Sequence, residues 1–199
     1  VTKVDVSRRP FVLETDSGQG WTADTIVIAT GAQAQDRVLR ILVGFPAGVS
    51  VDVVTRIVAE KMKDELKRPV IVDNRPGAGG RLAAELLKNA APDGATLLLT
   101  PYSMMSIYPH IYSKLSYDPF KDFVPVCLGS MLSHGLAVGP MVPASVRTVN
   151  DYLAWARANP KDANYGSPAA GSTPHFLGAL MGLSQNVDLK HVPYRGSVP

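Results

Sequence analysis

The spacing of apolar residues changes near residue 40, and the change divides the chain. Before it, residues 4–16 alternate, Asp16–Gly20 has the composition of a turn, and Trp21–Ile28 predicts a second strand. This pattern is typical of a small β-hairpin followed by a strand. From Ile41 to Val43 the apolar residues are continuous, which is typical of a strand buried on both faces.

The segment from Ile41 to Thr100 predicts a β-α-β-α-β unit. Ser50 can cap the first helix, and its apolar residues fall on one face, namely Val54, Ile57, Val58, Met62 and Leu66. A second helix is predicted at Arg81–Ala90, with strands at Pro69–Asp73 and Thr96–Thr100 on either side of it. This order is typical of parallel strands joined by right-handed crossovers.

The pattern is looser after Pro101. Residues 102–122 predict a long connection with one short helix. Thr148 can cap a helix, with Asp151 supporting its first turn, and Asn159-Pro160 ends it. The remaining predicted elements are strands at Phe123–Ser130, Leu136–Gly139, Asn164–Ser167 and His191–Tyr194, and a helix at His175–Leu183.

Two strand-to-helix loops, Gly44–Ser50 and Gly166–Thr173, are the candidate ligand sites. Ligands of open α/β sheets lie beyond the carboxyl ends of the strands, where both loops are placed. Their small residues let backbone N–H groups approach a ligand, and each leads into a helix start, which favours an anion. Two such loops facing each other would form a cleft for a carboxylate. An ordinary turn remains the alternative for each.

Composition excludes several classes of protein. The 199 residues carry a net charge of +3, and no run of Lys and Arg exceeds two, so nucleic-acid binding is not indicated. The single cysteine, Cys127, lies in an apolar run and predicts a buried, inert thiol rather than a disulfide, zinc or redox site. No apolar run is long enough to cross a bilayer.

No catalytic or cofactor motif emerges. The glycines of Asn74–Gly80 do not fit GxGxxG and predict a helix entry, and Ser167 lies outside a GxSxG elbow. The four histidines, 110, 134, 175 and 191, show no metal-ligand spacing. His175 is placed to contact a ligand or to cap a helix. The sequence therefore predicts no enzyme, no cofactor and no metal.

From about residue 40 onward, an ordered set of motifs resembles the substrate-binding proteins of tripartite tricarboxylate transporters, the Bug family. The matching stretches are ILVGFPAG at 41–48 with Asp52, VDNRPGAGG at 72–80, APDG at 91–94, YDP at 117–119, FVPV at 123–126, YGSP at 165–168, GSTPH at 171–175 and YRG at 194–196.

The resemblance implies an extracytoplasmic solute-binding protein that clamps a small mono-, di- or tricarboxylate and delivers it to membrane permease subunits. The implied fold is α/β, periplasmic-binding-protein-like and two-lobed, with mainly parallel sheets. Residues 37–101 would form the first lobe and 102–199 part of the second, incomplete at the C-terminus because family members continue beyond the Tyr-Arg-Gly strand. A periplasmic location is implied, although no signal peptide is seen at the N-terminus.

In this family the ligand carboxylate is held largely by backbone groups and ordered waters in the two loops. The implied ligand-binding residues are Phe45, Ala47, Gly48, Val49, Ser50, Asp52, Tyr102, Ser103, Ser167, Ala170, Gly171, Ser172, Thr173 and His175. The chain departs from the family at Val49 and at Ala169-Ala170, where glycine is usual. These changes restrict positive φ and are expected to narrow the pocket.

Residues 1–36 resemble a different family. VTKVDV at 1–6, LETDSG at 13–18 and WTADTIVIATGA at 21–32 look like the part of thioredoxin reductase that leads into the Ala-Thr-Gly motif of its FAD domain. The Gly-rich dinucleotide loop and the redox cysteine pair are missing from the sequence, so FAD binding is not expected. The resemblance implies a chimera. The alternatives are a flavin-dependent oxidoreductase fragment and a truncated chimera with no binding activity.

Overall fold

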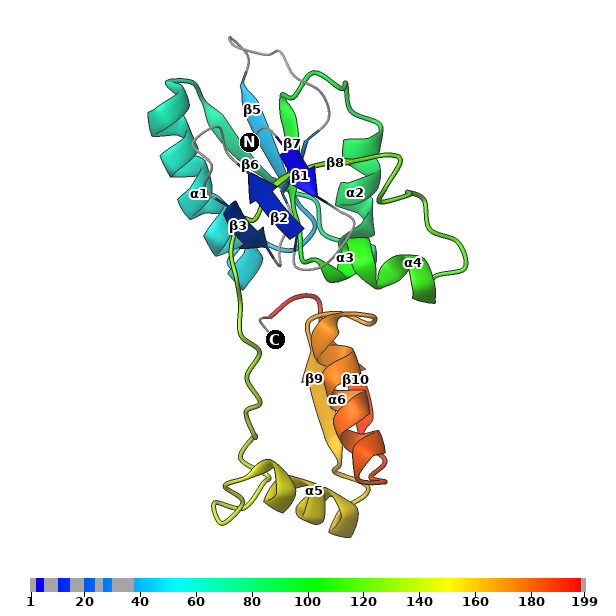
Figure 1. Ribbon diagram of the computed structural model, residues 1–199. Coiled ribbons are helices and arrows are strands. Elements are labelled where there is room, and N and C mark those ends of the chain that lie inside the picture. Colours follow the sequence, from blue (N-terminus) through cyan, green and yellow to red (C-terminus); the bar gives the residue numbers. More distant parts are fainter. Residues whose placement is uncertain (1–2, 6–10, 15–19, 24–26, 30–37, 198–199) are drawn as a thin grey trace. The chain divides into compact units, whose positions relative to one another are not determined.

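The computed structural model describes residues 3–5, 11–14, 20–23, 27–29 and 38–197. The chain divides into two compact units, Val1–Met131 and Leu132–Pro199. Each unit contains strands and helices (Figure 1).

The core of the first unit is the predicted β-α-β-α-β segment. Strand β5 pairs in parallel with β6 on one side and with β7 on the other. The elements are β5 (Leu39–Val43), α1 (Ser50–Leu66), β6 (Val70–Asn74), the 3-10 turn η1 (Ala78–Gly80), α2 (Arg81–Lys88) and β7 (Thr96–Leu99). The order and the parallel pairing confirm the sequence prediction.

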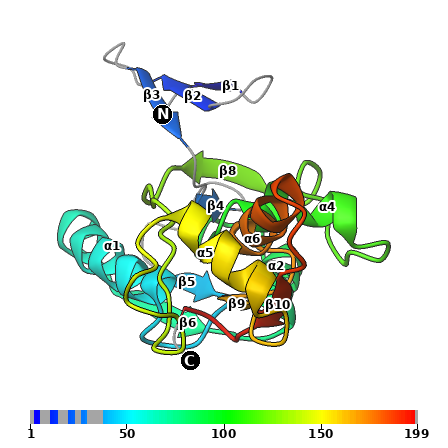
Figure 2. The same cartoon turned by 90° about the horizontal axis from the view of Figure 1, so that it is seen from below.

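Apolar strand residues form the centre of this unit. The two helices cover the three strands from opposite sides, α1 from one and α2 from the other (Figures 1 and 2). Four of the five residues of β5 are buried, as the continuous apolar run predicts. Two of these residues, Leu39 and Ile41, pack into a cluster with Ala59, Leu97 and Leu99.

Helix α1 turns a different face to the sheet than its apolar residues predict. Its buried residues are Asp52, Thr55 and Ala59, whereas Ile57 is 61% exposed and Leu66 is 46% exposed. The prediction for Ile57 and Leu66 is therefore wrong. The small Ala59 side chain allows close packing against the strands, and hydrogen bonds hold Asp52 against the preceding loop.

The N-terminal segment contributes strands to two sheets. Strands β1 (Lys3–Asp5), β2 (Phe11–Glu14) and β3 (Gly20–Ala23) form an antiparallel sheet, which confirms the predicted hairpin. Strand β4 (Val27–Ala29) instead joins the main sheet, so the single strand predicted over Trp21–Ile28 is wrong. Most of the predicted turn at Asp16–Gly20 and most of the Ala-Thr-Gly-Ala stretch lie outside the described residues.

Strand β4 lies between β7 and β8 (Val124–Cys127) and is antiparallel to both. The main sheet therefore has the order β6-β5-β7-β4-β8. Cys127, at the end of β8, is half-buried against the core cluster, and burial raises the pKa of its thiol. A raised pKa lowers the thiolate fraction, in agreement with the predicted inert thiol.

The division into units differs from the lobes that the sequence predicts. The boundary lies between Met131 and Leu132 rather than at 101/102. Residues 102–131 belong to the first unit because β8 pairs with β4 in its sheet. They also contain two short helices, α3 (Ser103–Ser106) and α4 (Tyr108–Ile111), where one was predicted.

The second unit is built on a parallel strand pair. Its elements are α5 (Val149–Ala158), β9 (Asn164–Ser167), α6 (Thr173–Ser184) and β10 (Lys190–Pro193), close to the predicted ranges. Its small core contains Tyr152, Leu153, Ala156, Ala163 and Val187. The strand predicted at Leu136–Gly139 does not form, and these residues instead line an open groove of about 780 Å³.

Gly44 provides a test of the packing that shapes the first loop. A Cβ at Gly44 would lie 2.5 Å from the Gly80 Cα and 2.8 Å from the Gly80 carbonyl oxygen, both backbone atoms. We expect Gly44→Ala to lower the free energy of unfolding by ~1–3 kcal/mol, because the η1 backbone must shift. The control is Gly135→Ala, where a Cβ meets nothing within 4 Å. Equal urea midpoints for the two variants would contradict the close approach.

Candidate functional site

The first candidate loop connects β5 to α1. Gly48 has a φ of 87°, a left-handed conformation that favours glycine. Helix α1 begins at Ser50, and its N-cap Val49 has no side chain able to bind the helix N–H groups. Ala47, Gly48 and Ser50 are exposed, whereas Phe45 and Val49 are buried. The exposed part of the loop is therefore mainly backbone and small side chains.

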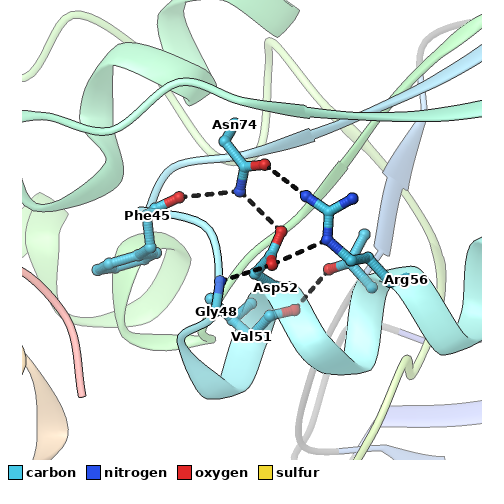
Figure 3. Close-up of polar contacts among 7 residues, drawn as sticks. Phe45, Gly48, Val51, Asp52, Arg56 and Asn74 are labelled. Carbon is cyan, nitrogen blue, oxygen red and sulfur yellow. Dashed lines mark hydrogen bonds and ion pairs between the residues drawn. The ribbon is translucent and has the colours of Figure 1, made fainter. Parts of the chain in front are cut away.

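The buried carboxylate of Asp52 closes this loop from behind (Figure 3). The Gly48 N–H donates to Asp52 Oδ2 over 2.8 Å, and Arg56 Nε donates to the same oxygen over 2.9 Å. Asn74 Nδ2 donates to Asp52 Oδ1 over 2.8 Å. Both carboxylate oxygens are thus engaged by groups of the protein.

Asn74 joins the loop to the end of β6. Besides Asp52, its Nδ2 donates to the Phe45 carbonyl over 3.1 Å, and its Oδ1 accepts from an Arg56 guanidinium nitrogen over 2.9 Å. One amide side chain therefore connects the loop backbone, the helix and the strand. The predicted helix entry at residues 74–80 also holds this loop in place.

The pKa of Asp52 is lowered by the sum of opposing effects. Burial on its own raises the pKa of this carboxyl, but the hydrogen bonds from Arg56, Gly48 and Asn74 and the charge of Arg56 outweigh it. A carboxyl whose pKa is lower in the folded state stabilises the fold above its unfolded pKa of about 3.9, and this stabilisation is lost as the pH falls below it.

The second candidate loop connects β9 to α6. Gly171 has a φ of 80°, and the Ser172 hydroxyl donates to the Ala169 carbonyl over 2.7 Å. The Ser167 hydroxyl donates to the same carbonyl over 3.0 Å. Ser167 and Ser172 are buried, and their hydrogen bonds stabilise the loop from its inner side. Ala170 is exposed.

Two histidines complete this second loop. His175 Nδ1 accepts a hydrogen bond from the Gly171 N–H over 3.0 Å. His191, from β10, lies 2.7 Å from the Ser167 hydroxyl through its Nε2, and its ring stacks on the His175 ring with centroids 3.8 Å apart. Sequence reasoning proposed His175 but missed His191. The parallel pairing of β9 with β10, which places Tyr165 opposite His191, is the signal that could have found it.

The helix starts at the two loops differ from the start of α5. Thr148 caps α5 with its side chain and forms a capping box with Asp151. Neither Val49 at α1 nor Ser172 at α6 makes a side-chain cap hydrogen bond. Uncapped N–H groups at the start of a long helix favour an anion.

Tyr102 and Ser103 follow β7, which is the parallel neighbour of β5. The structure thus brings them to the same end of the first unit's sheet as the first loop. Ser103 is buried and Tyr102 is half-buried. Among the residues that the structure describes, no group of His, Cys, Asp or Glu is arranged to hold a metal ion.

Asp52→Asn tests the closure of the first loop. The change removes the charge paired with Arg56, so we expect the free energy of unfolding to fall by ~1–3 kcal/mol at about pH 7. The difference from the parent chain should shrink towards about pH 3, because the unfolded carboxyl, with a pKa of about 3.9, is then protonated while the folded one resists protonation. Urea denaturation at both pH values measures it. A matched control is Glu60→Gln, at an exposed carboxylate near Lys63, and an equal loss there would contradict the assignment.

The chain is similar to several known proteins. The chain is 35% identical over 198 residues to the "UPF0065 protein in gbd 5'region" of Cupriavidus necator, covering 96% of this chain and 59% of the relative. It is 31% identical over 164 residues to the protein BugT of Bordetella pertussis, covering 82% and 50%. The chain thus spans about half the length of the curated relatives that it matches.

The first of these alignments bears on residues 1–36. It covers more of the chain than residues 37–199 alone could supply, so it reaches into the N-terminal segment. An alignment that reaches into residues 1–36 is not expected if this segment comes from an unrelated family. The resemblance to thioredoxin reductase stays a prediction.

Solved structures share the fold. Rpa4515 of R. palustris, determined with adipate, has a TM-score of 0.70 and 26% identity, with 81% of this chain and 53% of that chain covered. The periplasmic binding protein BugD has a TM-score of 0.67, 26% identity and coverage of 81% and 53%. MatC of Rhodopseudomonas palustris, with bound malate, has a TM-score of 0.65, 26% identity and coverage of 81% and 54%.

These likenesses confirm the predicted α/β, periplasmic-binding-protein-like fold class. Residues 54–199 also match the description "Tripartite tricarboxylate transporter family receptor". This match contains the second loop, α6 and β10, together with most of α1. The chain belongs to the tripartite tricarboxylate transporter receptor family.

Proposed function

We propose that this chain is a receptor for a small carboxylate, and that each of its two strand-to-helix loops offers backbone N–H groups to a carboxylate group. The observation that carries the proposal is the pair of helix starts at α1 and α6, which lack a side-chain cap although α5 in the same chain has a complete capping box. Backbone N–H groups at the start of a long helix, together with its dipole, favour a carboxylate oxygen.

Exposure divides the implied ligand residues into two groups. Ala47, Gly48, Ser50 and Ala170 are exposed, and Thr173 and His175 are half-buried. We assign ligand contact to this group and to half-buried Tyr102. The remaining residues are assigned to support the loops from behind, and they are Phe45, Val49, Asp52, Ser103, Ser167, Gly171 and Ser172, all of them buried.

The relatives support the ligand class and the setting. Two solved neighbours hold adipate and malate, both dicarboxylates, and a third is described as periplasmic. A dicarboxylate is therefore the first ligand to test. We assign the receptor to the periplasm and its delivery partner to the permease subunits of a tripartite transporter. None of the helices in the described part of the chain is both long and apolar enough to cross a membrane.

Charge placed in the exposed loop positions tests this function. We expect Ala47→Glu and Ala170→Glu each to weaken the binding of adipate or malate by at least about tenfold, because a carboxylate beside the helix start repels the ligand and competes for its N–H groups. Ala47→Gln and Ala170→Gln have nearly the same size without the charge and should remain within about threefold. Isothermal titration calorimetry measures all five proteins.

Two results would contradict the proposal. One is a folded parent chain that shows no saturable heat with any mono-, di- or tricarboxylate. The other is a pair of glutamate variants that bind as tightly as their glutamine partners. The first result would favour a chain without binding activity, and the second a site away from these loops.

A further inference from the structure

The stacked pair His175–His191 sits behind the second loop and contacts it at both ends. His191 reaches Ser167, where the loop begins, and His175 reaches Gly171, just before α6 begins. The two rings are inclined by only 22°. The loop is thus held through two imidazoles that lie face to face.

The hydrogen bonds fix where the protons lie. Because the Gly171 N–H donates to His175 Nδ1, this nitrogen carries no proton. With its single proton directed to the Ala169 carbonyl, the Ser167 hydroxyl accepts a hydrogen bond from His191 Nε2. Both rings can satisfy these contacts as neutral imidazoles. A proton added to His175 Nδ1 would set two donors against each other and release Gly171.

The surroundings also favour the uncharged pair. Burial, and then the adjacent His175, lower the pKa of His191. The groups around His191 are the Ser167 hydroxyl, the His175 ring and the ring of Tyr165, 5.1 Å away between centroids. The Tyr165 hydroxyl donates a hydrogen bond to the His175 carbonyl, and burial raises the pKa of Tyr165. Tyr165 therefore supplies no negative charge that could stabilise an imidazolium.

We propose that His191 is a positioning residue of the second loop, and that the loop binds a carboxylate most tightly while both stacked imidazoles are neutral. This inference rests on the proposed carboxylate-binding function and adds a regulator to the same site. Two charged rings at 3.8 Å would repel each other, and a charged His175 would lose the Gly171 amide. The affinity therefore falls as the pH falls, although a lower pH makes the protein more cationic.

Two substitutions separate the parts of this role. His191→Phe keeps an aromatic ring to stack on His175 but has no donor for Ser167. His191→Gln keeps a donor at a similar place but neither stacks nor titrates. His110→Phe makes the same chemical change at an exposed position of α4 and is the matched control.

The affinities for adipate and malate, measured from about pH 8 to about pH 6, where ordinary carboxyls stay ionised, test the proposal. We expect the parent chain and His110→Phe to lose affinity towards the lower end of this range. At about pH 8, His191→Phe should bind about tenfold more weakly and His191→Gln within about threefold, with a flatter pH profile. Affinity that rises as the pH falls, or a His191→Phe variant that matches the parent chain, would overturn the proposal.

Hydrogen exchange at the Gly171 amide tests the positioning role without a ligand. We expect exchange about tenfold faster in His191→Phe than in the parent chain and in His110→Phe, because His175 is no longer held in place. Equal exchange in all three proteins overturns the inference. If the parent chain binds neither adipate nor malate, the ligand class proposed above fails and this exchange measurement alone decides the role of His191.

Discussion

The carboxylate of Asp52 holds the first loop, because it joins three pieces of chain at one point. It accepts from the backbone of Gly48, from Arg56 one turn further along α1, and from Asn74 at the end of β6. A buried carboxylate is costly unless each oxygen is satisfied, and here both are. The position of the loop, the start of α1 and the rotation of α1 on the sheet all follow from these bonds. Asp52 can face the loop only if Ile57 turns towards solvent.

The second loop is held without a buried carboxylate. Ser167 and Ser172 converge on one carbonyl, that of Ala169, and two stacked histidines hold the ends of the loop. The two loops therefore respond to acid in different pH ranges. The hydrogen bonds of Asp52 lower the pKa of its carboxyl, so they persist below the range in which ordinary carboxyls titrate, whereas imidazoles take up protons at higher pH than carboxyls do. Mild acid should thus disturb the second loop first.

The local pattern of residues predicted the helices and strands well. It failed where contacts with residues far away in the sequence determine the structure. The limits of α5 and β9 follow from a capping box and a short alternating run, both readable from a few neighbouring residues. The face of α1 depends on Asn74, and the role of His191 on the pairing of β9 with β10. Leu136–Gly139 has the composition of a strand but no neighbouring strand to pair with in the described structure. Strand β4 is the opposite case. Its three residues come from the N-terminal segment, yet they form a strand because β7 and β8 pair with them on both sides in the main sheet.

Both loops present N–H dipoles rather than net charge, and this bears on selectivity. Asp52 is itself an anion at the start of α1 and would repel a ligand carboxylate, but Arg56 lies 2.9 Å away and balances its charge. Arg56 is half exposed, so solvent weakens the pair without removing this balance. The second loop is held by serine hydroxyls and two stacked histidines rather than by an ion pair. A site of this kind would recognise the shape of a carboxylate group by hydrogen bonds and hold it reversibly, as the proposed receptor function requires. It cannot distinguish one carboxylate from another by charge, so discrimination has to come from side chains that touch the rest of the ligand. Tyr102, half-buried at the sheet edge beside the first loop, is in the position to do this.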